Sequence, residues 1–288
     1  MTVRDLGYRA YEGERLPSSQ NTWVLLRYGL WRAWGSWIVK LTLIAALVSG
    51  LIGAALVAGT WWIRNQTVGA GAGDLPPLPG GEITSFFFNL QVWLFATVLT
   101  LRSGAGVIAE DFTFKAFQFY FAKPVTIVQY MIGRVAALTI LIFSVLFVPS
   151  LFIVLPLTGI SAAEYRLEMA GLVLPAFLYA LIAAVSLTTL SIGVSAISKS
   201  RALTMSAWIV LFVVPHVLAL LVDAITDWSW LYLISIPGML TVVREALFKV
   251  TSEGSDVEWF HAGPVLAILV TGAVAYAWSR LQRAEVIT

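Results

Sequence analysis

Two adjacent acidic residues, Glu110 and Asp111, are candidates for acid–base chemistry in this sequence. Neighbouring positions on a helix point about 100° apart, which is poor geometry for joint acid–base catalysis. The two histidines, His216 and His261, are far apart in the chain, and there is no cysteine, so the sequence predicts no metal site. It also contains no G-x-x-x-x-G-K-[ST] motif for nucleotide phosphates. We therefore expect a non-catalytic protein that holds no cofactor itself.

The acidic pair opens a segment in which aromatic residues are interspersed with lysines, and Pro124 ends this pattern. Its members are Phe112, Phe114, Lys115, Phe117, Phe119, Tyr120, Phe121 and Lys123. Asp and Thr are favoured at helix N-caps, and Pro cannot continue a helix. We therefore expect a short helix over about residues 112–122, capped by Asp111 or Thr113. It could form a docking surface for a cytoplasmic protein or a loop that dips into the lipid headgroups.

Long apolar runs flank this segment and indicate a membrane protein. The 288-residue chain is 59% hydrophobic and 12% charged, whereas soluble domains are about 25% charged. Six runs have close to the roughly 20 apolar residues that cross a bilayer core, namely 38–62, 84–108, 130–157, 169–195, 203–223 and 261–280. A further apolar stretch, 228–248, is interrupted by Pro237-Gly238 and predicts a re-entrant hairpin between the last two spans. The predicted fold is an all-α polytopic membrane protein with six transmembrane helices.

The distribution of positive charge predicts the orientation. All of the 18 Lys and Arg residues except Arg64, Arg166, Arg244 and Lys249 fall in segments that lie inside when the N-terminus is inside. Tryptophans and arginines before the first span predict an interfacial helix at 21–36, or a generic aromatic belt. We expect a cytoplasmic N-terminus with this helix (1–37), a six-span domain (38–280) and a cytoplasmic tail (281–288), in the inner membrane of a prokaryote.

Polar and small residues within the predicted spans are candidates for a transport path and for helix packing. Polar groups are costly in lipid, so we expect a path near Asn89, Gln91, Thr188, Ser191 and His216. Hydroxyl groups can instead bond to their own helix backbone, and a lone histidine is more often a packing residue. A stripe of small residues lies on one face of the first span, formed by Ala46, Gly50, Ala54 and Ala58. Such stripes allow close helix approach and predict an intrachain contact or a dimer seam.

The acidic pair and the residues after it resemble the ABC-2 type (type V) exporter permeases. Members of that family carry an A-E-D … P … Y-x-x-G-[KR] pattern, which is matched here by Ala109, Glu110, Asp111, Pro124, Tyr130, Gly133 and Arg134. The order of elements is also similar: an interfacial helix, six spans and a broken hairpin between the last two. The phenylalanines between the acids and Pro124 depart from the small or basic residues usual in the family.

This resemblance implies the permease subunit of an ATP-driven exporter, paired with a second copy or a similar permease. Two separate cytoplasmic ATPase subunits would bind ATP and Mg and would grip residues 110–124 as a coupling helix. The implied docking residues are Glu110, Asp111, Phe112, Phe114, Lys115, Phe117 and Lys123. Gly104 and Gly106, just before the acids, could form a hinge or permit close helix packing. Membrane lipid is an expected partner, and nucleic acid is not.

Three alternatives stay open, of which the first keeps the ATPase complex and the other two belong to different functional classes. A related complex could transmit force to an extracytoplasmic partner that binds residues 223–260. A secondary transporter would be expected to show internal repeats and charged midplane residues. An intramembrane enzyme would need clustered His, Asp or Glu residues within the spans, and the sequence shows no such cluster.

Overall fold

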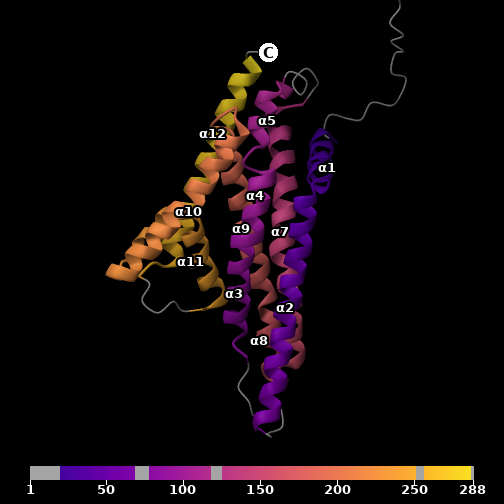
Figure 1. Cartoon of the computed structure of the whole chain (residues 1–288), viewed down its shortest axis with the longest axis vertical. Coiled ribbons are helices and arrows are strands. Elements are labelled where there is room, and N and C mark those ends of the chain that lie inside the picture. The colour runs from indigo at the N-terminus through magenta and orange to yellow at the C-terminus, as the bar shows by residue number, and fades with distance from the viewer. Residues whose placement is uncertain (1–19, 69–77, 118–124, 251–255, 287–288) are drawn as a thin grey trace, which may run out of the picture.

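The computed structural model describes residues 20–68, 78–117, 125–250 and 256–286 (Figure 1). These ranges are helical and contain no strand. Six of the helical segments are long and apolar enough to cross a membrane, which confirms a multi-pass helical fold. They are Trp37–Gln66, Gly80–Thr113, Ile127–Ile160, Arg166–Ser195, Arg201–Thr226 and Trp259–Arg283. Each contains one of the apolar runs predicted from the sequence.

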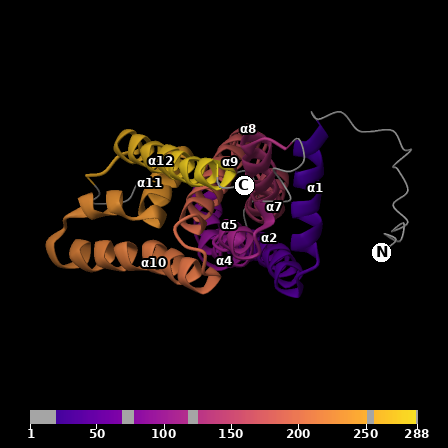
Figure 2. The same ribbon diagram turned by 90° about the horizontal axis from the view of Figure 1, so that it is seen from above.

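A central bundle is built around α7 (Ile127–Ile160), which begins with a capping box formed by Thr126 and Gln129. Its most extensive contacts are with α2 (Trp37–Val68), α9 (Val173–Ser195) and α1 (Asn21–Trp34). The second apolar segment also joins this bundle (Figures 1 and 2). It is formed by α3 (Gly80–Gln91), the π-helix η2 (Val92–Ala96) and α4 (Thr97–Ser103). Within this bundle, α7 thus contacts α1, α2, α9 and the whole of the second apolar segment.

The small-residue stripe of α2 lies partly in the α2–α7 interface. Ala46 and Gly50 are buried, and a Cβ atom on Gly50 would come within 2.7 Å of the backbone oxygen of Pro149. Further along α2, Ala54 is half-buried and Ala58 is exposed. The N-terminal half of the stripe therefore forms an intrachain contact, while Ala58 lies on the surface of the chain.

The helix predicted at 21–36 is present as α1, which runs along α7 before the chain turns into α2 (Figure 2). A Cβ atom on Gly133 of α7 would lie 2.6 Å from the Cβ atom of Leu25, so only glycine permits this contact. Trp23 and Trp31 of α1 are exposed. The position of α1 in the membrane interface stays a prediction.

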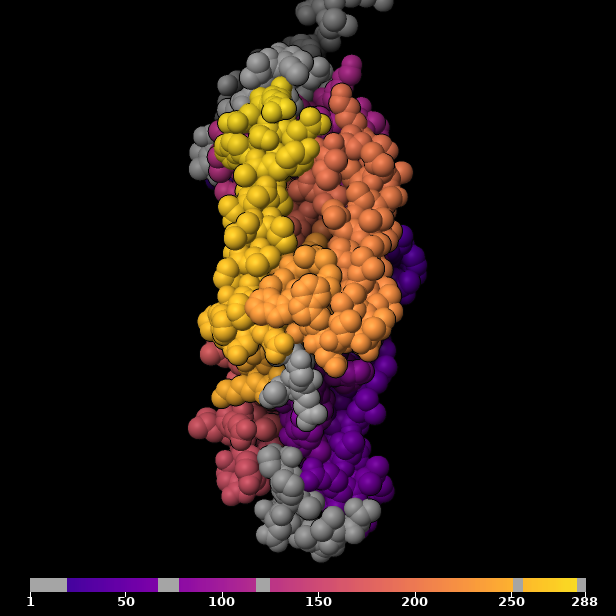
Figure 3. All heavy atoms as spheres, turned by 90° about the vertical axis from the view of Figure 1, so that its left-hand side faces the viewer, coloured from indigo at the N-terminus to yellow at the C-terminus, as the bar shows by residue number. Residues whose placement is uncertain are grey.

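The C-terminal part of the chain stands to one side of the bundle (Figures 1 and 2). It comprises α10 (Arg201–Thr226), the 3-10 helix η3 (Ser229–Ile234), α11 (Ile236–Phe248) and α12 (Trp259–Val286). Only 17% of the apolar window of α10 or α12 is buried, against 50% for α7. Figure 3 views the face that α10 and α12 present. Most of the surface of these two helices is thus open to lipid or to another protein.

The apolar stretch 228–248 does not form one helix, because η3 and α11 are separated at Ser235. The hydroxyl of Ser235 accepts a hydrogen bond from the N–H of Gly238 at 3.0 Å, and Pro237 occupies the first turn of α11, where proline is tolerated. The 13 residues of α11 span about 20 Å, which is shorter than a hydrocarbon core of about 30 Å. The break argues against a seventh span, and re-entry into the membrane stays a prediction.

The helix predicted at about 112–122 lies only partly within the described residues. Its first two positions are the end of a different helix, α5 (Val107–Thr113), whose N-cap is Gly106, so Asp111 and Thr113 lie inside α5 and do not cap it. Residues 116 and 117 are helical again, and residues 118–122 lie outside the described ranges. Gly106 has no side chain to accept the first free N–H groups. The hydroxyl of Ser195 on α9 replaces it, accepting from Ile108 at 2.8 Å and Ala109 at 3.1 Å.

The segment beyond α5 turns sharply. Phe114 is the C-cap, and Lys115 adopts a left-handed backbone conformation with φ 53°. Residues 118–124 lie outside the described residues, so the predicted positions of Lys123 and Pro124 in this segment are not part of the structure.

Candidate functional site

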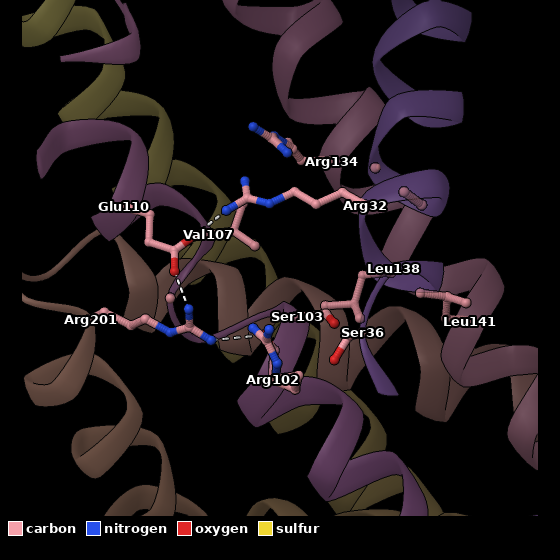
Figure 4. Close-up of a pocket in the computed structure, with 14 residues that line it drawn as sticks. Arg32, Ser36, Arg102, Ser103, Val107, Glu110, Arg134, Leu138, Leu141 and Arg201 are labelled. Carbon is pink, nitrogen blue, oxygen red and sulfur yellow. Dashed lines mark hydrogen bonds and ion pairs between the residues drawn. The ribbon is translucent and has the colours of Figure 1, made fainter. Parts of the chain in front are cut away.

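Glu110 connects α5 to two other helices at the end of the molecule where α1, α5 and the C-terminus of α12 lie (Figure 1). We refer to this end, which carries Arg27, Arg32, Arg102, Arg134, Arg201, Arg280 and Arg283, as the basic end. One carboxylate oxygen of Glu110 accepts from Arg32 of α1, and the other accepts from Arg201 of α10 (Figure 4). Arg201 also donates to the backbone carbonyl of Arg102 at 3.3 Å. Glu110 thus ties α5 to α1 and α10, and Arg201 ties α10 to α4.

Asp111 points in a different direction from Glu110, toward the start of α7. One of its carboxylate oxygens accepts a hydrogen bond from the hydroxyl of Tyr130 at 2.5 Å and another from Nη2 of Arg134 at 2.8 Å. The side chains of Asp111 and Arg134 are only 7% and 5% exposed. Because a buried charge is costly unless it is paired, this contact fixes α5 against α7. The carboxylate of Asp111 is therefore not available at the molecular surface.

The aromatic side chains of this segment divide into a buried group and an exposed tip. Phe117 is buried and packs against the rings of Phe112 and Tyr130, with centroids 4.8 and 5.5 Å away. Phe114, in contrast, is 73% exposed, and Lys115 beside it is also exposed. We name Phe114 and Lys115 the α5 tip. Among the predicted docking residues that the structure describes, these two project most freely from the molecule.

The glycines before the acids lie in a crowded turn between α4 and α5. A Cβ atom on Gly104 would lie 2.8 Å from Cδ2 of Leu138, and one on Gly106 would lie 2.8 Å from Cγ of Arg201. A side chain at either position would have to displace these neighbours, so close packing by itself accounts for both glycines. Their action as a hinge stays a prediction.

The polar residues predicted to line a path remain separate from one another. Gln91 is fully buried just before the π-helix, and neither of its side-chain polar atoms has a hydrogen-bond partner in the described structure. The hydroxyl of Thr188 is likewise buried without a partner there, and the hydroxyl of Ser191 donates to the backbone oxygen of Thr188 at 2.9 Å. His216 contacts the hydroxyl of Ser235 at 3.0 Å.

Asn89, the fifth of these residues, is half-buried. Within the described ranges, no side-chain hydrogen bond joins any two of the five side chains. Thr188 and Ser191 are neighbours on α9, and no side-chain network within the described ranges joins them to the other three residues. A continuous path through these polar groups stays a prediction.

Sequence reasoning did not pair Glu110 with Arg32 and Arg201, nor α5 with Ser195. These partners lie 78, 91 and 86–87 residues away from the positions they contact. The only available signal was the positive-inside pattern, which collects arginines at one membrane level without saying which of them meet.

Two comparisons with known proteins, by family and by curated sequence, identify no relative of this chain. No family model matches it, and no curated protein matches it significantly. The fold and the site together define a multi-pass helical membrane protein in which a short helix is held by ion pairs at the basic end.

Proposed function

We propose that this chain is the permease subunit of an ATP-binding-cassette exporter, in which separate ATPase subunits hydrolyse ATP and drive substrate export. The observation that carries this proposal is the attachment of α5. Glu110 holds it to α1 and α10, and Asp111 holds it to α7. A coupling element must bias the packing of several helices at once, and ion pairs to three helices give α5 that ability.

The α5 tip is the part of this element that a partner would touch. Phe114 offers a large exposed aromatic ring, and aromatic residues commonly anchor protein interfaces. Lys115 adds a cation beside it. Asp111 and Phe117 are buried, so their role in this account is to hold the tip in place.

The remaining parts of the proposal follow from charge and surface. The concentration of Lys and Arg at the basic end supports a cytoplasmic location for that end in a prokaryotic inner membrane. The exposed apolar faces of α10 and α12 leave room for lipid and for a second permease copy. In this arrangement α1 lies in the inner interface, the stretch 228–248 re-enters from the outer side, and ATP and Mg belong to the partner ATPase.

Co-purification tests this proposal directly. The native chain, extracted in mild detergent, should bring with it an ATPase subunit and ATP hydrolysis. Phe114→Asp should reduce the recovered ATPase at least tenfold, because a charge would replace the exposed anchor. The matched control is Leu167→Asp in α8 (Arg166–Gly171), since Leu167 is 84% exposed and α8 lies at the opposite end.

This control should recover as much ATPase as the native chain. The proposal is wrong if the native chain purifies without associated ATP hydrolysis, or if both variants retain the ATPase equally.

A further inference from the structure

Four arginine side chains from four different helices line one cavity at the basic end (Figure 4). Arg32 comes from α1, Arg102 from α4, Arg134 from α7 and Arg201 from α10. The cavity has a volume of about 140 Å³, several times the roughly 30 Å³ that a water molecule occupies in the liquid. The hydroxyl-bearing residues Ser36 and Ser103 and the glycines Gly29 and Gly106 also line it.

The negative charge of the carboxylates at this site is smaller than the positive charge of its arginines. Glu110 divides its two oxygens between Arg32 and Arg201, and Asp111 pairs with Arg134. Arg102 is half-buried and makes no ion pair with any carboxylate in the described ranges. Four cations thus face two anions in a partly enclosed space. Like charges repel one another there, and an anion entering the cavity would relieve that repulsion.

We propose that this cavity binds a phosphate-bearing anion, with its oxygens accepting hydrogen bonds from Arg102 and the neighbouring guanidinium groups. The planar fork of arginine donors matches phosphate oxygens, often in bidentate pairs, and it keeps its charge at any physiological pH. The serine hydroxyls can donate further hydrogen bonds. Since the site draws on four helices, a bound anion would also strengthen the contacts among them.

Two sources offer the same chemistry. One is the headgroup of an anionic phospholipid, since basic pockets between membrane helices on the cytoplasmic side bind such headgroups. The exposed tryptophans of α1 beside the cavity fit a location at headgroup level. The other source is a soluble phosphate. This inference does not depend on the exporter proposal, because the binding measurement below involves no ATPase.

The test is a binding titration on the full chain, purified in a zwitterionic detergent and followed by its thermal unfolding. One arm adds phosphatidylglycerol, with phosphatidylcholine as its reference. A second arm adds inorganic phosphate, with chloride at equal ionic strength as its reference. We expect saturable stabilisation in at least one arm. Stabilisation by phosphatidylglycerol but not by inorganic phosphate assigns the site to a lipid headgroup. Stabilisation by inorganic phosphate, with or without an effect of the lipid, shows that the site recognises the phosphate group from either source.

Variants connect this binding to the cavity. Arg102→Gln should weaken the anion affinity at least tenfold while leaving the ion pairs of Glu110 in place. The matched control is Arg283→Gln, an exposed arginine at the same end, which should bind as the native chain does. A second pair, Ser36→Glu against Ser36→Gln, adds a carboxylate or its neutral equivalent to the cavity wall. The carboxylate should compete with the anion, whereas the amide should not.

The proposal is overturned if neither arm exceeds its reference on the native chain. It is also overturned if Arg102→Gln binds the anion as tightly as Arg283→Gln does. Should Arg102→Gln not fold, equal binding by the two Ser36 variants overturns the proposal instead.

Discussion

At the scale of single residues, Glu110 and Asp111 are adjacent in the chain but have different surroundings. The side chain of Asp111 is 7% exposed and that of its partner Arg134 is 5% exposed. Glu110 is 15% exposed, and the arginines that hold it, Arg32 and Arg201, are 43% and 35% exposed, so its ion pairs are partly solvated. Exposed ion pairs contribute about 0–1 kcal/mol, whereas removing one partner of a buried pair costs about 3–5 kcal/mol. We therefore assign Asp111 to stability, and, within the proposed exporter, Glu110 to transmission between the ATPase and the spans.

The first prediction concerns the buried pair. Asp111→Asn should lower the free energy of unfolding by about 3–5 kcal/mol, because the guanidinium of Arg134 would stay buried without its counter-charge. Thermal unfolding in detergent, followed by tryptophan fluorescence, should show a clearly lower Tm. The double variant Asp111→Asn with Arg134→Met should recover much of that loss. A single variant with the native Tm would contradict the assignment.

The second prediction concerns the shared carboxylate. Glu110→Gln should lower the free energy of unfolding by about 1 kcal/mol, less than Asp111→Asn does, because Arg32 and Arg201 can still be solvated although Glu110 itself is only 15% exposed. It keeps the α5 tip, so the ATPase should still bind, but export per ATP hydrolysed should fall in reconstituted vesicles. The result that counts against this view is a Tm loss as large as that of Asp111→Asn, with coupling unchanged.

At the scale of helices, the close contact of α2 with α7 depends on a missing side chain. Gly50→Ala should lower the free energy of unfolding by about 1–3 kcal/mol, because its Cβ atom would meet the backbone of Pro149. The control on the same helix is Gly59→Ala, whose Cβ atom would meet nothing within 4 Å. That variant should be neutral or more stable, since alanine favours helix by up to about 1 kcal/mol. Equal Tm values for both variants would show that the contact is loose.

The helices themselves were largely predictable from the sequence. Apolar length alone located all six long segments, because a membrane requires about 20 apolar residues per span. The break in 228–248 was also predicted from Pro237-Gly238, although it falls at Ser235, where the serine cap starts α11. These features depend on the local sequence, namely on the length of the apolar runs and on the residues that cap the helices.

The start of α5 could not be predicted in this way. Its cap is supplied by Ser195, a residue of another helix, and the glycine before it has no cap of its own. The partners of Glu110 depend likewise on how α1 and α10 approach, which no local pattern specifies. The motif that includes Asp111, Tyr130 and Arg134 did mark residues that the structure brings together, but its pattern alone did not say that they touch.

At the scale of the whole molecule, the orientation can be tested because the chain has no cysteine to compete for labelling. We predict that Arg283→Cys at the basic end reacts with an impermeant maleimide only after cells are opened. Leu167→Cys at the opposite end should react in intact cells whose outer barrier is permeable. Both positions are exposed, so accessibility should reflect the side of the membrane. The reverse labelling pattern would show that the chain has the opposite orientation, with α5 outside the cytoplasm.

The central claim is that an ATPase docks on the α5 tip. The most direct measurement replaces Phe114 with a photoreactive benzoylphenylalanine, irradiates intact cells, and identifies the adduct by peptide mass spectrometry. The same substitution at Leu167 is the reference. We predict that position 114 yields an adduct containing a protein with a G-x-x-x-x-G-K-[ST] nucleotide-binding motif, and that position 167 does not. Adducts at position 114 that contain only lipid, or a protein without that motif, would contradict the proposed function.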